Sequence, residues 1–381
     1  EDGLYYMDTR APDHYTRYNA NELLNKSIIR VDATATADYL WVGTTQGLLQ
    51  VDKRTNQITT YRSDPSQPGS LSNGFIGAIY WGRPGKLWLG THKGINKASI
   101  QGRPFQSYQI IPTPPSFHQL ENEIFSVVED QNSTIWVSSA GHGLYRMNPK
   151  THQFTRVVVN PLDKLTTKVR SQGWSLLEDR QGRLWVGTGN EKGLYQLDQL
   201  TGKFIRYPCQ LNVRMLAQDS FGKLWIGGVS GEMASFDPFT KKFTYYQANE
   251  KDATSLIPGF VNDLMVSRTG EVWMATTRGV GRMDPVTGHS IRYQHNYRSA
   301  FGSINDPHAM ALYEDQAGII WIGTHGGGLN RLDPKTNTFT YYTTRQGLPS
   351  NRIMSLIGDE KGNLWDGIAQ RHRARKIHGA E

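Results

Sequence analysis

A tryptophan inside an apolar, strand-like segment recurs along the whole chain. The clearest copy reads Ile320-Trp321-Ile322-Gly323-Thr324, and successive tryptophans lie 40 to 49 residues apart. Repeats of this length with strand-like content are typical of propeller blades. The sequence therefore predicts an all-β fold, a single β-propeller of four-stranded blades. The eight tryptophans are Trp41, Trp88, Trp136, Trp185, Trp225, Trp273, Trp321 and Trp365.

Each copy predicts four short strands. An apolar first strand such as Ile353-Met354-Ser355-Leu356 leads through an Asp- and Gly-rich turn into the tryptophan strand. A glycine loop then leads to the third strand, and the hairpin to the fourth reads Asp237-Pro238-Phe239-Thr240 in one copy. Aspartate accepts hydrogen bonds from turn amides and proline presets φ. We therefore interpret these aspartates as turn residues rather than catalytic ones.

The two ends of the chain each supply half a blade. Residues 1–18 predict strands three and four, and residues 352–368 predict strands one and two. Seven complete blades fit within 28–342, and 369–381 form a tail. Because unpaired sheet edges promote aggregation, we expect the ends to pair and close an eight-bladed ring. The alternative is a seven-bladed ring with a spare half-blade at each end, and Trp365-Asp366-Gly367 departs from the usual apolar-Gly-Thr continuation.

The repeated tryptophans are expected to pack between neighbouring blades, because each indole can bury a large apolar area. Trp174 stands outside the repeat and follows the polar, basic loop 168–173. It is therefore a better candidate for contact with a ligand.

Composition limits the partners and the bonds that hold the fold. The net charge is +8, and the basic run Arg371–Lys376 is interpreted as a solvated terminus, so no nucleic-acid partner is expected. A single cysteine, Cys209, excludes an internal disulfide framework. No apolar run has the length of a membrane span. The chain begins as if in mid-repeat, so we expect that a natural leader and flanking domains have been cut away.

The repeat resembles the two-component regulator propeller repeat. The resemblance is carried by Gly347-Leu348-Pro349-Ser350-Asn351-Arg352-Ile353, followed by Asp359-Glu360-Lys361-Gly362-Asn363-Leu364-Trp365. It implies the periplasmic or extracellular sensor region of a bacterial receptor of the hybrid two-component or sensor histidine kinase type. It further implies an oligosaccharide or other small polar ligand, a homodimer formed through the receptor, and membrane contact only through missing flanking segments.

The loops between strands two and three and the connections between blades share one face of a propeller. They are the longer and more variable parts of this chain, and binding residues concentrate on such loops. With the positive net charge, basic side chains on this face fit an anionic ligand. No cofactor, metal or catalytic residue is expected. The candidate ligand-binding residues are His92, Lys93, His142, Arg170, Trp174, Lys192, Arg278 and His325.

Three alternatives remain open. His92, His142 and His325 occupy equivalent loop positions, which favours a metal-dependent propeller lyase acting on a polysaccharide or cyclic ester if the ring brings them together. A glycosidase would need two facing carboxylates, for which the loops offer Glu121, Glu123 and Glu191. A protein–protein interaction scaffold would need neither arrangement.

Overall fold

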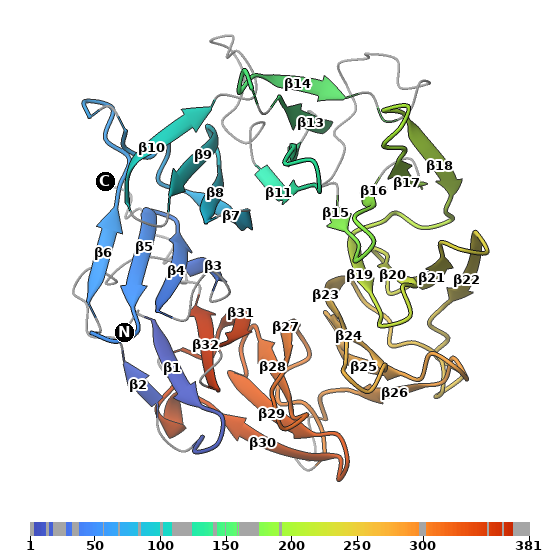
Figure 1. Ribbon diagram of the computed structural model, residues 1–381. Coiled ribbons are helices and arrows are strands. Elements are labelled where there is room, and N and C mark those ends of the chain that lie inside the picture. Colours follow the sequence, from blue (N-terminus) through green and yellow to red (C-terminus); the bar gives the residue numbers. More distant parts are fainter. Residues whose placement is uncertain are drawn as a thin grey trace, which may run out of the picture.

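The fold is a ring of eight four-stranded antiparallel sheets (Figure 1). The structure is a computed structural model. No helix in the part of the chain that it describes is long and apolar enough to cross a membrane. The described residues are 4–12, 15–17, 28–32, 38–55, 57–67, 69–82, 85–99, 102–108, 124–139, 143–148, 150–157, 159, 175–189, 193–296, 302–348, 350–359 and 362–368.

Four blades occupy the N-terminal half of the chain. Blade 1 contains β3 (Ile28–Asp32), β4 (Tyr39–Thr44), β5 (Gly47–Asp52) and β6 (Ile58–Tyr61). Blade 2 contains β7 (Ile76–Gly82), β8 (Lys86–Thr91), β9 (Gly94–Ser99) and β10 (Gly102–Tyr108). Blade 3 contains β11 (Ile124–Glu129), β12 (Ile135–Ser139), β13 (Gly143–Met147) and β14 (Phe154–Val157). Blade 4 contains β15 (Ser175–Glu178), β16 (Leu184–Thr188), β17 (Gly193–Leu197) and β18 (Phe204–Pro208).

The remaining blades complete the ring. Blade 5 contains β19 (Met215–Gln218), β20 (Leu224–Gly227), β21 (Met233–Asp237) and β22 (Lys242–Tyr246). Blade 6 contains β23 (Val261–Val266), β24 (Val272–Thr276), β25 (Gly279–Met283) and β26 (Ser290–Tyr293). Blade 7 contains β27 (Ala309–Glu314), β28 (Ile320–Thr324), β29 (Leu329–Asp333) and β30 (Thr338–Tyr342), and the short 3-10 helix η3 (Thr344–Gln346) follows it. Blade 8 contains β31 (Ile353–Gly358), β32 (Asn363–Ile368), β1 (Tyr5–Asp8) and β2 (Tyr15–Arg17).

Blade 8 is shared between the two ends of the chain. Strand β1 pairs antiparallel with β32, so that Tyr6 lies opposite Trp365 and Met7 opposite Leu364. The predicted eight-bladed ring is therefore confirmed, and the seven-bladed alternative is wrong. Asp366 and Gly367 lie within β32 and pair with β31, so the unusual sequence after the tryptophan does not interrupt the strand.

In every blade the first strand lies nearest the ring centre and the fourth lies at the rim (Figure 1). The first strands of neighbouring blades pack against one another around the ring. The end of each first strand that follows an inter-blade connection is therefore close to the ring axis. This placement decides which side chains from different blades can act on one ligand.

The eight tryptophans form the core between blades, as predicted. None of them is more than 2% exposed. Trp321 of blade 7 packs with Ile353 and Leu364 of blade 8, and Trp365 of blade 8 packs with Leu40 of blade 1. Each indole thus joins its own blade to the next one. Blade 8 packs against both of its neighbours in the same way. The two chain ends are therefore held by core packing as well as by strand pairing.

A buried aspartate holds the indole from the turn between strands one and two. In blade 5 one carboxylate oxygen of Asp219 accepts from the amides of Phe221 (3.0 Å) and Lys223 (2.9 Å). The other oxygen accepts from Trp225 Nε1 (3.0 Å). The same indole bond is made by Asp130, Asp179, Asp315 and Asp359. The Asp-x-x-Gly turn therefore fixes the core tryptophan as well as the hairpin.

Candidate functional site

The two faces of the ring differ in construction. The turn face carries the hairpins between strands one and two and between strands three and four. There Asp237 Oδ1 accepts from the amides of Phe239 (2.8 Å) and Thr240 (3.3 Å), so this hairpin aspartate is a turn residue, as predicted. The loop face carries the loops between strands two and three and the connections between blades.

The threonine after the tryptophan strand fixes the loop between strands two and three. Thr91 Oγ1 donates to Gly94 O (2.9 Å) and accepts from the amide of Lys93 (3.0 Å). Thr276 and Thr324 are also fully buried and bond their own glycine loops in the same way. The threonine at this position therefore has a structural role, both after glycine (Thr91, Thr324) and after alanine (Thr276).

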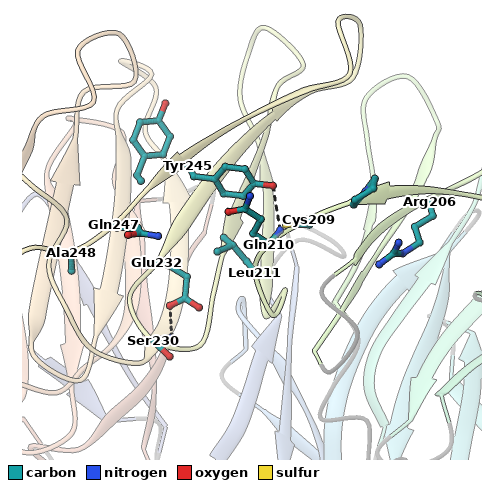
Figure 2. Close-up of a pocket in the computed structure, with 11 residues that line it drawn as sticks. Arg206, Cys209, Gln210, Leu211, Ser230, Glu232, Tyr245, Gln247 and Ala248 are labelled. Carbon is teal, nitrogen blue, oxygen red and sulfur yellow. Dashed lines mark hydrogen bonds between the residues drawn. The ribbon is translucent and has the colours of Figure 1, made fainter.

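A cavity of about 830 Å³ opens on the loop face between blades 4 and 5 (Figure 2). The outer strands β18 and β22 form two of its walls, and the connections that follow them and the loop after β20 complete it. Clefts of this volume on a rigid scaffold are typical of small-ligand sites. The lining residues are Arg206, Pro208, Cys209, Gln210, Leu211, Ser230, Glu232, Tyr245, Tyr246, Gln247 and Ala248.

The cavity combines an aromatic ring with hydrogen-bonding groups. Tyr245 Oη accepts from the amide of Gln210 (3.2 Å), which fixes the ring across the boundary between the two blades (Figure 2). Glu232 accepts from the amide of Ser230 (2.8 Å) and keeps its other oxygen for a further donor. Arg206 adds a cation. Burial raises the pKa of the Cys209 thiol, so this side chain is neutral at pH 7.

The connection from β18 to β19 explains why the cavity lies here. Cys209, Leu211 and Val213 alternate along it and are all buried in the core of blades 4 and 5. Their neighbours Gln210 and Arg214 are exposed. The repeat containing this connection is also the shortest, with 40 residues between Trp185 and Trp225. A short connection pinned to the core leaves the space between the outer strands uncovered.

The structure places four of the eight predicted ligand-binding residues, and they lie in three separate blades. His92 in blade 2 stacks on Phe75 with ring centroids 3.8 Å apart. Lys93 follows it in the same loop. Arg278 in blade 6 forms an exposed ion pair with Glu250 at 3.3 Å.

In blade 7 the ring centroid of His325 lies 6.1 Å from that of His308. The backbone N–H of His325 donates to the carbonyl of His308 (2.9 Å). None of the four described candidates lines the cavity between blades 4 and 5.

The other predicted residues lie outside the described part of the chain. These are His142, Arg170, Trp174 and Lys192, together with the glycosidase candidates Glu121, Glu123 and Glu191. Among the described residues, no group of three or more His, Cys, Asp or Glu side chains is arranged to hold a metal ion. The histidine arrangement of the lyase alternative includes His142, so it stays a prediction.

The cavity residues were not predicted from the sequence. The prediction was based on distinctive residues in the long loops, and most of the cavity residues lie elsewhere. Tyr245 and Arg206 lie on ordinary fourth strands, and only the short connection beside them leaves them lining the cavity. The shortened spacing between Trp185 and Trp225 was the available signal.

Three segments of the chain match the family described as "Two component regulator propeller", at residues 70–93, 173–190 and 303–326. A curated relative, histidine kinase P4 of Formosa agariphila, is 27% identical over 364 residues. The match covers 81% of this chain and 26% of that protein. The chain therefore spans about a quarter of the length of this relative.

Two solved structures share the fold. The extracellular domain of a putative hybrid two component system from B. thetaiotaomicron has a TM-score of 0.54 at 20% identity, covering 94% of this chain and 53% of that one. Virginiamycin B lyase from Staphylococcus aureus has a TM-score of 0.53 at 14% identity, covering 76% of this chain and 92% of that one. At these identities the similarity concerns the fold.

The matched segments end at equivalent places in the repeat, five residues after Trp88, Trp185 and Trp321. Two of them run from an inter-blade connection through strands one and two to the loop that follows, and the third includes β15 and β16 of blade 4. The resemblance drawn from the sequence is thus confirmed: three segments of this eight-bladed propeller match the two-component regulator propeller repeat.

Proposed function

We propose that this propeller is the ligand-recognition region of a bacterial signal-transduction receptor and that it binds an oligosaccharide or another polar ligand on its loop face. The relative named as a histidine kinase and the fold shared with the extracellular domain of a putative hybrid two component system support a sensor role. The solved structure is an extracellular domain, which supports an extracellular location. We place this chain at the periplasmic or extracellular face of a membrane receptor, with the membrane reached only through segments outside it.

The observation that carries the proposal is the cavity between blades 4 and 5. Sugars present apolar C–H faces and many hydroxyls, so they are bound by an aromatic ring combined with polar side chains that fix orientation. Tyr245, Glu232, Gln210 and Arg206 supply this combination around one cavity. The turn face offers mainly tight turns whose aspartates are already bonded to their own amides.

The mechanism is binding without chemistry. A ligand in this cavity contacts two blades at once, since Arg206 comes from blade 4 and Glu232 and Tyr245 come from blade 5. If two receptor copies form a dimer with two arrangements, the ligand shifts their balance only by its difference in affinity for the two. A propeller needs no cofactor for this role.

Calorimetry of the 381-residue chain against a panel of neutral and acidic oligosaccharides tests the proposal. We expect saturable binding of at least one sugar, and a loss of about tenfold or more in affinity for Tyr245→Ala. Phe239→Ala, on the turn face, is the matched control and should bind as tightly as the original chain.

Turnover of a bound sugar that a chelator abolishes would instead support the lyase. Absence of binding across the panel, together with a protein partner captured by the chain, would support the scaffold.

A further inference from the structure

Arg214 occupies a place close to the ring axis on the loop face. It directly precedes β19 and lies eleven residues before Trp225. The equivalent residues of the next two blades, eleven before their own tryptophans, are Asn262 and Met310. In blades 6 and 7 this residue is the one at which the pairing of the first two strands skips a position. A residue left out of the ladder directs its side chain differently from its neighbours.

The residue at this position in blade 6 makes a hydrogen bond to the next blade. Asn262 Nδ2 donates to the carbonyl of Ala309 at the start of the next first strand (2.8 Å). Arg214 Nε donates to the equivalent carbonyl, that of Val261 (2.7 Å). A single N–H therefore completes the bond between blades, and the short asparagine side chain supplies it. The bond between the blades does not need the other nitrogens of the Arg214 guanidinium.

The guanidinium is held in place, but no carboxylate among the described residues pairs with it. Its central carbon lies 4.1 Å from the ring centroid of Phe260, a cation–π contact that orients the guanidinium. None of the ion pairs found among the described residues includes Arg214. Partial burial lowers the pKa of this guanidinium, yet an arginine remains charged at neutral pH. The residue is exposed as a whole. Among the described residues its guanidinium bonds one acceptor, Val261 O, and does so through Nε, which leaves the two terminal nitrogens for a ligand.

We infer that Arg214 binds the carboxylate of an acidic saccharide, a uronate, through its two terminal nitrogens. The inference rests on the proposed function and narrows its ligand class. Planar guanidinium and carboxylate groups pair through two parallel hydrogen bonds. Because Val261 O and Phe260 already fix the guanidinium, little side-chain freedom is lost when the carboxylate arrives.

The backbone connects this site to the cavity between blades 4 and 5. A Cβ atom added at Gly231 would lie 2.8 Å from the amide nitrogen of Gly259, so the two loops are in close contact. Gly231 separates the cavity residues Ser230 and Glu232, and Gly259 directly precedes Phe260. The cavity and Arg214 therefore flank a single ridge on the loop face, which suits an extended saccharide rather than a single sugar ring.

The test uses two probes that differ only at their carboxyl groups, trigalacturonate and its methyl ester, measured by calorimetry. The ester removes the negative charge and places a methyl group on each carboxyl. The unchanged chain should bind the acid about tenfold or more tightly than the ester. Arg214→Asn copies the residue of blade 6, so it keeps the bond to Val261 O and should lose this preference. Lys241→Asn removes the same charge on the turn face and should keep the preference. Lys241 has a φ of +59°, which asparagine tolerates.

The outcomes separate the two proposals. Equal binding of the acid by Arg214→Asn and the unchanged chain overturns the role of Arg214 and leaves the sensor proposal standing. Equal binding of acid and ester by the unchanged chain also overturns the role of Arg214 and leaves the sensor proposal standing. Failure of the unchanged chain to bind either probe overturns the uronate assignment, and failure across the wider panel overturns carbohydrate sensing as well. A loss of preference in Lys241→Asn would also contradict a local site, since it would indicate diffuse attraction by net charge.

Discussion

The carboxylate of Asp179 and the indole nitrogen of Trp185 share a hydrogen bond of 2.7 Å, and both side chains are buried. Four other blades repeat this bond. It ties the turn between strands one and two to the core between neighbouring blades. An aspartate that the sequence assigns to a turn therefore also positions the residue that joins the blades.

Replacing Asp219 by alanine should destabilise the ring. Asp219→Ala leaves the buried Trp225 Nε1 and two turn amides without their acceptor, at a cost of about 2–3 kcal/mol. Asp284→Ala is the control, because Asp284 accepts from turn amides and holds no indole. It should cost less than about 1 kcal/mol. Urea unfolding of both variants measures the difference, and equal losses would show that the indole bond contributes nothing.

Blade 6 should gain stability from the aspartate that it lacks. Ser267 stands where the turns of blades 3, 4, 5, 7 and 8 have aspartate, and the buried Trp273 Nε1 finds no acceptor among the described residues. Ser267→Asp should raise the free energy of unfolding by about 1 kcal/mol. The same substitution in a Trp273→Phe background has no indole N–H to bind, so the gain should disappear. A gain that persists there would refute the proposed cause.

The fold could be predicted from the sequence because its determinants are local and repeated. The tryptophan occurs in all eight units, the aspartate six residues before it in five, and the Gly-Thr pair after it in four. The half-blades at the two ends required only pairing of complementary strands. In contrast, the cavity depends on which elements lie side by side in space, so that Arg206 and Tyr245 have no distinctive local sequence. Four predicted site residues lie outside the described chain, and their roles stay predictions.

The carboxyl group of Asp8 should titrate at unusually low pH. Bonds from the Arg10 side chain (both 2.8 Å) and the Arg10 amide lower its pKa to about 2. A depressed pKa means that Asp8 contributes stability above its unfolded pKa of about 3.9. That contribution is lost as the pH falls toward 2. An NMR titration should give a midpoint near the lower value, and Arg10→Gln should raise it. A midpoint of about 3.9 in the unchanged chain would contradict the contact.

Four apolar side chains at hairpin tips on the turn face should contribute little to stability. Leu200, Phe221, Phe239 and Val286 are between 91% and 98% exposed and come from three consecutive blades. Serine at all four positions should change the free energy of unfolding by less than about 0.5 kcal/mol per site, and should raise solubility. A larger loss in urea unfolding would reveal packing that the structure does not contain.

The central claim is that the loop face between blades 4 and 5 recognises the ligand while the turn face does not. Hydrogen–deuterium exchange with and without a bound oligosaccharide tests it directly. We predict slower exchange in 206–214 and 228–232 and at the end of β22, with the hairpins at 198–203 and 237–242 unchanged. Slower exchange confined to those hairpins, or to blades remote from the cavity, would contradict the account.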